Sequence, residues 1–230
     1  MTTLRFEHAG GPLELELGAL VVAGWTARDE SAVRHHVEEL AAIGVAPPSA
    51  FPLYYRAAAS LATLATAIEV VGAETSGEAE PLVVVAGGER WLGLGSDHTD
   101  RALEAHSVAL SKQACAKPVA AGLWAWEEVA DRLDALELRS WIDEGDGWTP
   151  YQEGTLGTIR PLEELLLGAG DALGPGGRDA GAAAGAMLCG TLPAIGGVRP
   201  AGAFRMALHD PTRDRTIEHE YRVHALPVVA

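Results

Sequence analysis

Alternating and continuous apolar positions predict strands along most of this chain. Residues 13–25, "LELELGALVVAGW", alternate strictly and then become continuously apolar, as a strand does when it enters a core. Residues 67–72 predict a further strand, and residues 81–95 predict two short strands joined by a turn. Residues 136–154 alternate like a hairpin around a glycine-rich turn, and residues 204–226 predict two antiparallel strands around a polar turn.

Helical periodicity is confined to fewer segments. Residues 27–44 repeat apolar positions on one face and end at a glycine, which predicts a helix. Residues 100–112 and 161–174 predict two more helices, and residues 117–133 mix a strand with a helix. Prolines predict a loop over residues 45–56. Because strands outnumber helices and do not alternate regularly with them, the predicted fold class is α+β and rich in sheet.

Composition and charge narrow the classes of function. The 230 residues suit one large domain, and 48% hydrophobic residues supply a packed core. The formal net charge of −15 argues against binding to nucleic acid or to an anionic membrane surface, because both require a basic footprint. Two cysteines are too few for a disulfide framework, which favours free thiols in a reducing cytosol. With no signal peptide and no apolar stretch of spanning length, the sequence predicts a cytoplasmic protein.

Carboxylates gather between residues 78 and 100. Glu78 and Glu80 are two positions apart in "EAE", so a strand would direct both side chains to one face. Asp97 follows the next apolar stretch and could join them in an all-oxygen site, with Asp100 close by. Such ligands suit Mg²⁺, Mn²⁺ or Ca²⁺ rather than zinc. The alternative is a solvated turn whose carboxylates face water.

An imidazole and a carboxylate lie three positions apart on the helix predicted over residues 27–44. His36 and Glu39 would be neighbours on its surface and could hold and deprotonate a water molecule. His35 and Glu38 form the same pair one position round the helix, and periodicity does not choose between the two pairs. An exposed pair without a function is the alternative.

Cations and a glycine-rich turn accompany the carboxylates. The cations are Arg56, Arg101, Lys112 and Lys117. They could be salt-bridge partners of the carboxylates or could bind an anion. Residues 187–197, "MLCGTLPAIGG", follow an apolar strand, and their backbone N–H groups and the Thr191 hydroxyl could hold an oxyanion or a carboxylate. No dinucleotide fingerprint, phosphate loop or serine-nucleophile motif accompanies these residues.

The order of these motifs resembles the fumarylacetoacetate hydrolase-like superfamily over nearly the whole chain. "RHHVEEL" offers the family's His-x-x-Glu, and "GEAEPLVVV" is similar to its strand that opens with Glu-x-Glu. "SDHTDRAL" is similar to its N-D-x-S-A-R-D, which aligns Asp97 with the metal aspartate and Arg101 with the arginine. Further matches are the loop "PSAFPLYYRAA", Lys112 with Pro118, "YQEGTLGTI", "LCGTLPAIGG" and the closing hairpin over residues 206–223.

Departures from the family's pattern indicate a divergent bacterial branch rather than fumarylacetoacetate hydrolase itself. The interval from Glu80 to Asp97 is short, the asparagine–tyrosine lead-in to the helix is missing, and Arg56 stands where the family has lysine. Ser96 replaces the asparagine before the metal aspartate. Pro81 directly follows Glu80, and because proline removes a ladder hydrogen bond, it predicts an edge strand or a bulge.

The resemblance implies a fold and a set of site residues. The fold is a mixed β-sandwich or roll of the fumarylacetoacetate hydrolase C-terminal type with peripheral helices. It spans residues 1–230 as one domain, and residues 1–50 supply an N-terminal strand and a lid helix. The implied metal ligands are Glu78, Glu80 and Asp97, the implied catalytic residues are His36, Glu39 and Lys112, and the implied substrate contacts are Tyr55, Arg56, Arg101 and Thr191.

The implied function is that of a metal-dependent hydrolase with Mg²⁺ or Mn²⁺ as cofactor, Ca²⁺ being a further option. It would cleave a C–C bond in a small diketo- or acylpyruvate-like oxo-acid, through an enolate held on the metal and water activated by the His–Glu pair. Decarboxylase, hydratase or tautomerase chemistry on a related oxo-acid stays open, and so does a non-catalytic metabolite-binding protein of the same fold. The family usually forms homodimers, and an exposed aromatic residue such as Trp148 would suit that interface.

Overall fold

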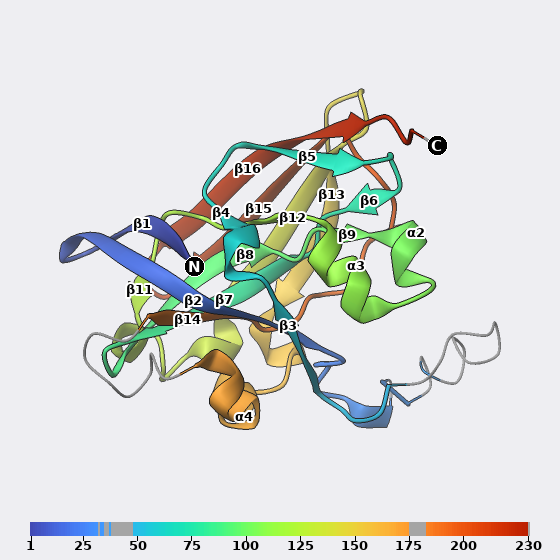
Figure 1. Cartoon of the computed structure of the whole chain (residues 1–230). Coiled ribbons are helices and arrows are strands. Elements are labelled where there is room, and N and C mark those ends of the chain that lie inside the picture. Colours follow the sequence, from blue (N-terminus) through green and yellow to red (C-terminus); the bar gives the residue numbers. More distant parts are fainter. Residues whose placement is uncertain (32, 35–36, 38–47, 175–182, 230) are drawn as a thin grey trace.

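Two curled β-sheets packed face to face form the body of the protein (Figure 1). The computed structural model describes residues 1–31, 33–34, 37, 48–174 and 183–229. The larger sheet has seven strands, in the order β1 (Thr2–His8), β2 (Gly11–Gly24), β14 (Ala184–Leu188), β7 (Ala79–Ala86), β8 (Glu89–Ser96) and β11 (Trp124–Ala125), with β3 (Leu53–Ala57) paired to β2.

A five-stranded sheet covers one face of the larger one. Its order is β13 (Trp148–Thr155), β12 (Glu137–Asp143), β15 (Ala203–Asp210), β16 (Arg215–Leu226) and β5 (Ala67–Val71). Two ribbons of two strands each lie outside these sheets, β10 (Lys117–Pro118) with β4 (Ala62–Thr63), and β6 (Thr75–Ser76) with β9 (Thr99–Asp100).

Short helices lie at the periphery. The described α-helices are α2 (Arg101–Glu104), α3 (Val108–Ala114) and α4 (Leu162–Ala169). Single 3₁₀ turns are η1 (Ala59–Leu61), η2 (Trp126–Glu128), η3 (Leu133–Ala135), η4 (Leu156–Thr158) and η5 (Gly170–Leu173). In Figure 1, α2 and α3 lie beside β6 and β9, whereas α4 lies at the opposite end of the larger sheet. The α+β fold class, rich in sheet and with peripheral helices, is confirmed.

Strand β7 reads as a continuous apolar run because both of its faces are buried. Val83 and Val85 belong to the core between the two sheets, whereas Leu82 and Val84 belong to a second core on the opposite face of the larger sheet. Side chains of a strand alternate between faces, so one run supplies both cores. The beginning of β7 is thereby fixed deep in the molecule.

The prediction that Pro81 marks an edge strand or a bulge is wrong. Strand β7 lies between β14 and β8, and Pro81 pairs in regular register with Leu94. The Pro81 carbonyl accepts a hydrogen bond from the Cys189 N–H at 3.1 Å, just beyond the end of β14 at Leu188. The nitrogen and carbonyl of one strand residue point to the same side. The missing N–H therefore points past the last residue of β14, where the ladder needs no donor.

Most predicted strands are confirmed, and the differences have local causes. The predicted helix over residues 100–112 is two helices, because Asp100 caps α2 through the Leu103 N–H and Ser107 caps α3 through the Leu110 N–H. Within the predicted loop over residues 45–56, pairing with β2 makes a strand, β3. Residues 117–133 contain two short strands and a 3₁₀ turn rather than an α-helix. Most of the helix predicted over residues 27–44 lies outside the described residues.

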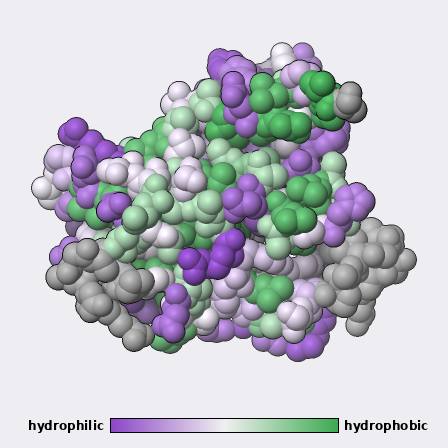
Figure 2. Space-filling view, viewed as in Figure 1, coloured by the Kyte–Doolittle hydropathy of each residue, from purple (hydrophilic) through white to green (hydrophobic). Residues whose placement is uncertain are grey.

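The surface mixes polar and apolar residues (Figure 2). Exposed apolar side chains gather near the C-terminus, at the ends of β5 and β16, and comprise Val71, Leu226, Val228 and Val229. Trp148, predicted as an exposed interface residue, is half-buried, and the Arg205 guanidinium lies 4.4 Å from its ring centroid. Within the part of the chain that the structure describes, every helix is too short or too polar to cross a bilayer.

Candidate metal centre

The three predicted metal ligands converge where β7 begins and β8 ends. Because these strands are antiparallel, Ala79 at the start of β7 pairs with Ser96 at the end of β8. The Asp97 N–H donates to the Glu78 carbonyl at 2.9 Å, so Asp97 and Glu78 lie side by side just beyond the Ala79–Ser96 pair. One carboxylate oxygen from each of Glu78, Glu80 and Asp97 lies within 4.8 Å of the other two. The strand pairing therefore brings together the carboxylates that the sequence separates by 17 positions.

Burial excludes a solvated turn for two of these carboxylates. Glu80 is 3% exposed and Asp97 is 1% exposed, whereas the Glu78 side chain is 17% exposed. Two buried anions so close together repel each other and have lost their hydration, which costs several kcal/mol per ion unless cations compensate them. A compensating cation is therefore an expected part of this centre.

Three cations line the carboxylates. Lys112 Nζ lies 2.6 Å from Asp97 Oδ2 and 3.4 Å from Glu78 Oε2, and Lys117 Nζ lies 3.0 Å from Asp97 Oδ1. Arg101 Nη2 lies 3.3 Å from Glu78 Oε1. Neither Asp97 oxygen accepts a well-aligned hydrogen bond from a described residue, so its contacts with the lysines are ion pairs. The Asp97 lone pairs are therefore only partly engaged.

The charges set opposite pKa shifts on neighbouring carboxyls. Burial, with the negative charges of Asp97 and Glu78 adding to it, raises the pKa of the Glu80 carboxyl well above its usual range. Burial alone would raise the pKa of Asp97 too, but the ammonium groups of Lys112 and Lys117 outweigh it and lower that pKa to about 2. Asp97 is thus a permanent anion at the centre of the cluster.

Residues from strand β13 and from the turn after β14 hold Glu80 and its neighbours in place. The Gly190 N–H donates to Glu80 Oε2 at 2.8 Å, and the Thr191 hydroxyl donates to the Ala79 carbonyl at 2.8 Å. Gln152 Oε1 accepts from the Ala79 N–H at 2.9 Å, and Gln152 Nε2 donates to Thr191 Oγ1 at 2.6 Å. The predicted turn after β14 therefore lies at the centre and binds one of its carboxylates.

Asp100 and His98, the other ionisable residues next to Asp97, support the turn. Asp100 caps α2, and the buried His98 ring lies 2.9 Å from both Tyr221 Oη and Thr75 Oγ1. Burial, with the charges of Lys117 and Arg101, lowers the pKa of His98 to about 3. The ring is therefore neutral, and its two nitrogens hydrogen-bond to Tyr221 and Thr75.

The remaining predicted site residues are placed differently. Arg56 is exposed on β3 and forms no ion pair with any other described residue. Tyr55 is half-buried, and its hydroxyl accepts a hydrogen bond from Trp25 Nε1 at 3.3 Å. His36 and Glu39 lie outside the described residues. The roles of all four therefore stay predictions.

Sequence reasoning missed Thr26, which follows a strand end, carries no local signal and lies against the Cα of Gly190. Gln152 belongs to the matched motif "YQEGTLGTI", but the sequence assigned it no role at the centre. Lys117 had a signal, since it and Lys112 are the only lysines in the chain and lie five positions apart. It was one of four candidate cations, with no reason to prefer it.

The donor set fits a hard divalent ion. All three carboxylates offer oxygen, and Asp97 keeps partly engaged lone pairs in a buried position. Oxygen-only ligands of this kind suit Mg²⁺, Mn²⁺ or Ca²⁺. If a divalent ion binds, these are the residues that would hold it.

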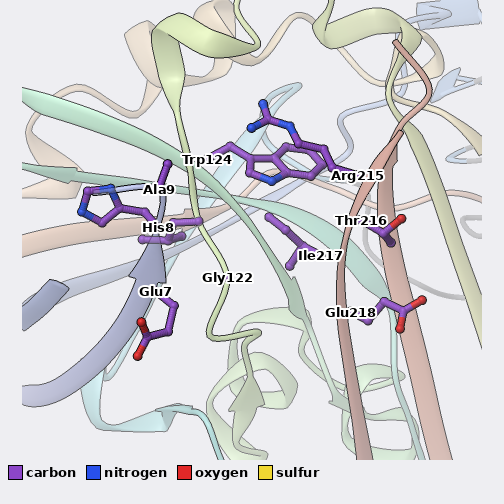
Figure 3. Close-up of a pocket in the computed structure, with 10 residues that line it drawn as sticks. Glu7, His8, Ala9, Gly122, Trp124, Arg215, Thr216, Ile217 and Glu218 are labelled. Carbon is purple, nitrogen blue, oxygen red and sulfur yellow. The ribbon is translucent and has the colours of Figure 1, made fainter. Parts of the chain in front are cut away.

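A separate hollow of about 480 Å³ opens between the end of β1, β11 and the start of β16 (Figure 3). Its wall includes Glu7, Trp124 and Glu218, and the Arg215 guanidinium lies 4.5 Å from the Trp124 ring centroid. Arg215 Nη1 also pairs with Glu128 at 2.6 Å. None of the predicted site residues lines this hollow, so it is distinct from the carboxylate cluster.

Several solved structures share this fold at low sequence identity. A protein from Burkholderia cenocepacia described as a fumarylpyruvate hydrolase has a TM-score of 0.59 and 18% identity, over 99% of this chain and 94% of that one. A 5-carboxymethyl-2-hydroxymuconate delta-isomerase from Mycobacterium smegmatis has a TM-score of 0.58 and 14% identity over 100% of both chains. A 2-keto-3-deoxy-D-arabinonate dehydratase has a TM-score of 0.62 and 15% identity, over 94% of this chain and 75% of that one.

These neighbours confirm the predicted fold, which is that of the fumarylacetoacetate hydrolase-like superfamily. In sequence, no curated protein matches the chain significantly. One family does match, over residues 23–221, which include every residue of the carboxylate cluster and its three cations. The chain therefore belongs to the family described as "Protein of unknown function (DUF2848)", and its fold is the one that these hydrolase, isomerase and dehydratase structures share.

Proposed function

We propose that this chain is a divalent-metal-dependent hydrolase that cleaves a C–C bond in a small diketo- or acylpyruvate-like oxo-acid. The observation that supports it most is the cluster of Glu78, Glu80 and Asp97, buried or half-buried and within 4.8 Å of one another. We propose that these residues hold Mg²⁺ or Mn²⁺. When bound, the ion would stabilise the negative charge that develops on the oxygens of the substrate.

The surrounding cations would bind the anionic substrate. Arg101 is held by Ser76 at 2.7 Å and Glu104 at 2.7 Å, so its guanidinium is fixed in direction beside Glu78. Lys112 reaches the cluster from α3, and its side chain is 8% exposed. Together they would orient the carboxylate of an oxo-acid, and we keep Lys112 as a catalytic residue and Tyr55, Arg56 and Thr191 as further substrate contacts.

Water would be the second reactant. His36 and Glu39, assigned on the sequence resemblance, would take its proton as the oxygen adds to the distal carbonyl carbon. The C–C bond next to that carbon then breaks, and its electron pair leaves as the enolate of the second product, which gains a proton. The products are a carboxylic acid and a 2-oxo-acid. Bulk water is excluded from the carboxylates of Glu80 and Asp97, because both side chains are buried.

Calorimetric titration of the metal-stripped protein with Mg²⁺ and Mn²⁺, with and without oxalate, tests this proposal. Oxalate presents two coplanar oxygens, as the enolate of a 2-oxo-acid does. We expect one metal site per chain and tighter binding when oxalate is present. Because Asp97→Ala leaves the buried Lys117 without a carboxylate partner and could cost about 3–5 kcal/mol of stability, Asp97→Asn is the safer variant.

Both Asp97 variants should lose metal binding while circular dichroism still reports a folded chain. Asp131→Asn, a change to an exposed carboxylate, is the matched control and should bind metal like the wild type. If Asp97→Asn still binds metal like the wild type, the proposed metal site is wrong. A chain that binds metal and oxalate but turns over no oxo-acid in a broad panel would be a metabolite-binding protein.

Isomerase, hydratase or decarboxylase chemistry is the second candidate, because an isomerase and a dehydratase share the fold. Turnover in water labelled with ¹⁸O separates these reactions. Hydrolysis places the label in a newly formed carboxylate, whereas isomerisation, dehydration and decarboxylation form no new carboxylate.

A further inference from the structure

Both lysines of this chain contact one carboxylate. The sequence has 15 arginines and two lysines, and Lys112 and Lys117 lie against opposite oxygens of Asp97. A lysine ammonium is a compact point charge, whereas the guanidinium of arginine is a broad planar fork. A chain that otherwise uses arginine thus places its only two compact cations at the buried ligand of the proposed metal site.

The two lysines differ in what else they can contact. Lys112 Nζ lies within 3.6 Å of Glu78 and Glu104 as well as Asp97, so it keeps anionic partners if Asp97 turns to a metal. Lys117 is fully buried on β10, and Asp97 is its sole carboxylate partner among the described residues. Its other contact is the carbonyl of His98, to which it donates at 2.5 Å.

Lys117 cannot move away from Asp97. The His98 ring is held from the far side by Tyr221 and Thr75, so the carbonyl that binds the ammonium is fixed as well. Removal of the buried ammonium from both oxygens would leave it without a hydrogen-bond acceptor or an anion, which is strongly unfavourable. A divalent ion bound to Asp97 therefore meets a positive charge that stays beside the same carboxylate.

We propose that Lys117 is a built-in counter-ion of the metal centre. It compensates Asp97 when no divalent ion is present, and it weakens the binding of the ion by charge repulsion and by sharing the Asp97 carboxylate. This inference rests on the proposed metal site and adds to it the residue that sets its affinity. If Lys117 were purely structural, its replacement would destabilise the fold and would leave the affinity for metal unchanged or lower it.

Metal titration of two Lys117 variants tests the proposal. Lys117→Met removes the charge and the donor, whereas Lys117→Gln removes the charge and keeps an N–H for the His98 carbonyl. We expect Mg²⁺ and Mn²⁺ to bind either variant at least about tenfold more tightly than the wild type, or about 1.4 kcal/mol. The rise in melting temperature at saturating Mn²⁺ should be correspondingly larger in the variants, because ligand stabilisation grows with affinity.

Arg205→Met is the control for loss of a cation elsewhere. Arg205 pairs with Glu220 at 2.8 Å on the exposed face of the five-stranded sheet, and its loss should leave metal affinity unchanged. Unchanged or weaker metal binding in both Lys117 variants would overturn the proposal while the metal site itself stands. If the wild type binds no metal, the proposed metal site fails first, and the role of Lys117 fails with it.

Wild-type protein labelled with ¹³C and ¹⁵N only in lysine supplies a test that needs no variant. Two lysines produce two ε-CH₂ signals, so both can be followed without ambiguity. Mn²⁺ is paramagnetic, and it should broaden both signals at stoichiometric amounts, whereas Mg²⁺ should shift both. A lysine signal that Mn²⁺ leaves sharp would show that one ammonium lies away from the ion and would overturn the proposal.

Discussion

Gly190 is constrained both by its backbone and by its neighbour. Its φ of +101° lies in a region that side chains rarely adopt, and a Cβ there would overlap the side chain of Thr26. At the same time its N–H binds Glu80. The residue therefore has to be glycine for the turn to place a donor against a buried carboxylate.

Gly190→Ala should lower the free energy of unfolding by about 3 kcal/mol or more, since φ strain and steric overlap add. It should also weaken metal binding, because the displaced N–H no longer orients Glu80. Urea denaturation and calorimetry measure the two effects. Gly197→Ala is the matched control, with a φ of +85° and no heavy atom near its Cβ, and should cost only about 1 kcal/mol. Equal losses in both variants would contradict the steric argument.

Single residues differ in how far the sequence predicted them. Asp97 could be named because it follows an apolar strand in a recognisable motif. Glu80 is buried because both faces of β7 are covered, whereas the "EAE" spacing indicates only that Glu78 and Glu80 share a face. Gln152 lies in the matched motif "YQEGTLGTI", but its role could not be assigned, because it depends on four partners in β7, β12 and the turn after β14.

The turn between β15 and β16 is organised by one buried carboxylate. Asp210 is fully buried at its side chain and accepts hydrogen bonds from Arg132 at 2.9 Å and from the N–H groups of Thr212 and Arg213. The hydrogen bonds and charge of Arg132 outweigh burial and lower the pKa of Asp210 to about 2. Arg132 comes from the segment after η2, so this carboxylate ties that segment to the hairpin.

The lowered pKa predicts how Asp210 contributes to acid stability. Because the pKa of Asp210 is lower in the folded state than its ordinary value, its contribution is fully present above about pH 5 and is lost as the pH falls toward 2. Asp210→Asn should therefore cost about 2 kcal/mol at pH 7 and progressively less between pH 5 and 2. Chemical denaturation at several pH values measures the difference.

Asp131→Asn removes the exposed carboxylate that pairs with the same arginine at 2.8 Å. An exposed pair contributes little, so this control should change stability by no more than about 0.5 kcal/mol at any pH. A pH-independent loss in Asp210→Asn would mean that shape rather than charge accounts for the effect.

Elements were predicted well where local periodicity decides them. Strands β12 and β16, one from each predicted hairpin, alternate in burial as the sequence alternates in polarity. Strand β3 was missed because the prolines before it indicate a loop, and only its pairing with β2 makes residues 53–57 extended. The break between α2 and α3 depends on Ser107, a cap within an otherwise helical pattern.

The two sheets are joined beside the carboxylate cluster through Gln152. Its Oε1 accepts hydrogen bonds from the Ala79 N–H and from Ser140 Oγ at 2.7 Å, and its Nε2 donates to Thr191 and to the Leu192 carbonyl at 2.7 Å. Strand β13 of the smaller sheet is thereby bonded to β7 of the larger one. Every donor and acceptor of this buried amide is used.

Gln152→Met should lower the free energy of unfolding by about 3 kcal/mol, because it leaves buried polar partners without a hydrogen bond. Metal affinity should fall as well, since Ala79 lies between Glu78 and Glu80. Gln113→Met is the matched control: Gln113 is exposed, and its Oε1 accepts from the Ala58 N–H at 2.9 Å, so water can replace it at a cost of about 0.5 kcal/mol. A Gln152 variant with unchanged metal affinity would contradict the link between the two sheets and the centre.

The sequence was sufficient for the features that depend on near neighbours. Alternation predicts the strands, "EAE" places two carboxylates on one face, and the net charge of −15 argues against binding to nucleic acid or to an anionic membrane surface. The order of the motifs was enough to indicate the superfamily fold that the structure has. Each of these follows from spacings of a few residues or from composition.

Strand order decided the rest. Glu80 meets Gly190 because β14 pairs with β7, and Ser96 meets Tyr221, 125 positions later, because β16 of the smaller sheet packs against β8. Asp97 meets Lys117 because the chain after α3 returns beside the end of β8, where Val119 bridges Gly95. Local periodicity carries no information about which strands become neighbours, since pairing depends on how the two sheets bury their faces together. That packing gives Lys112 two further carboxylate partners besides Asp97, whereas Lys117 has Asp97 alone among the described residues.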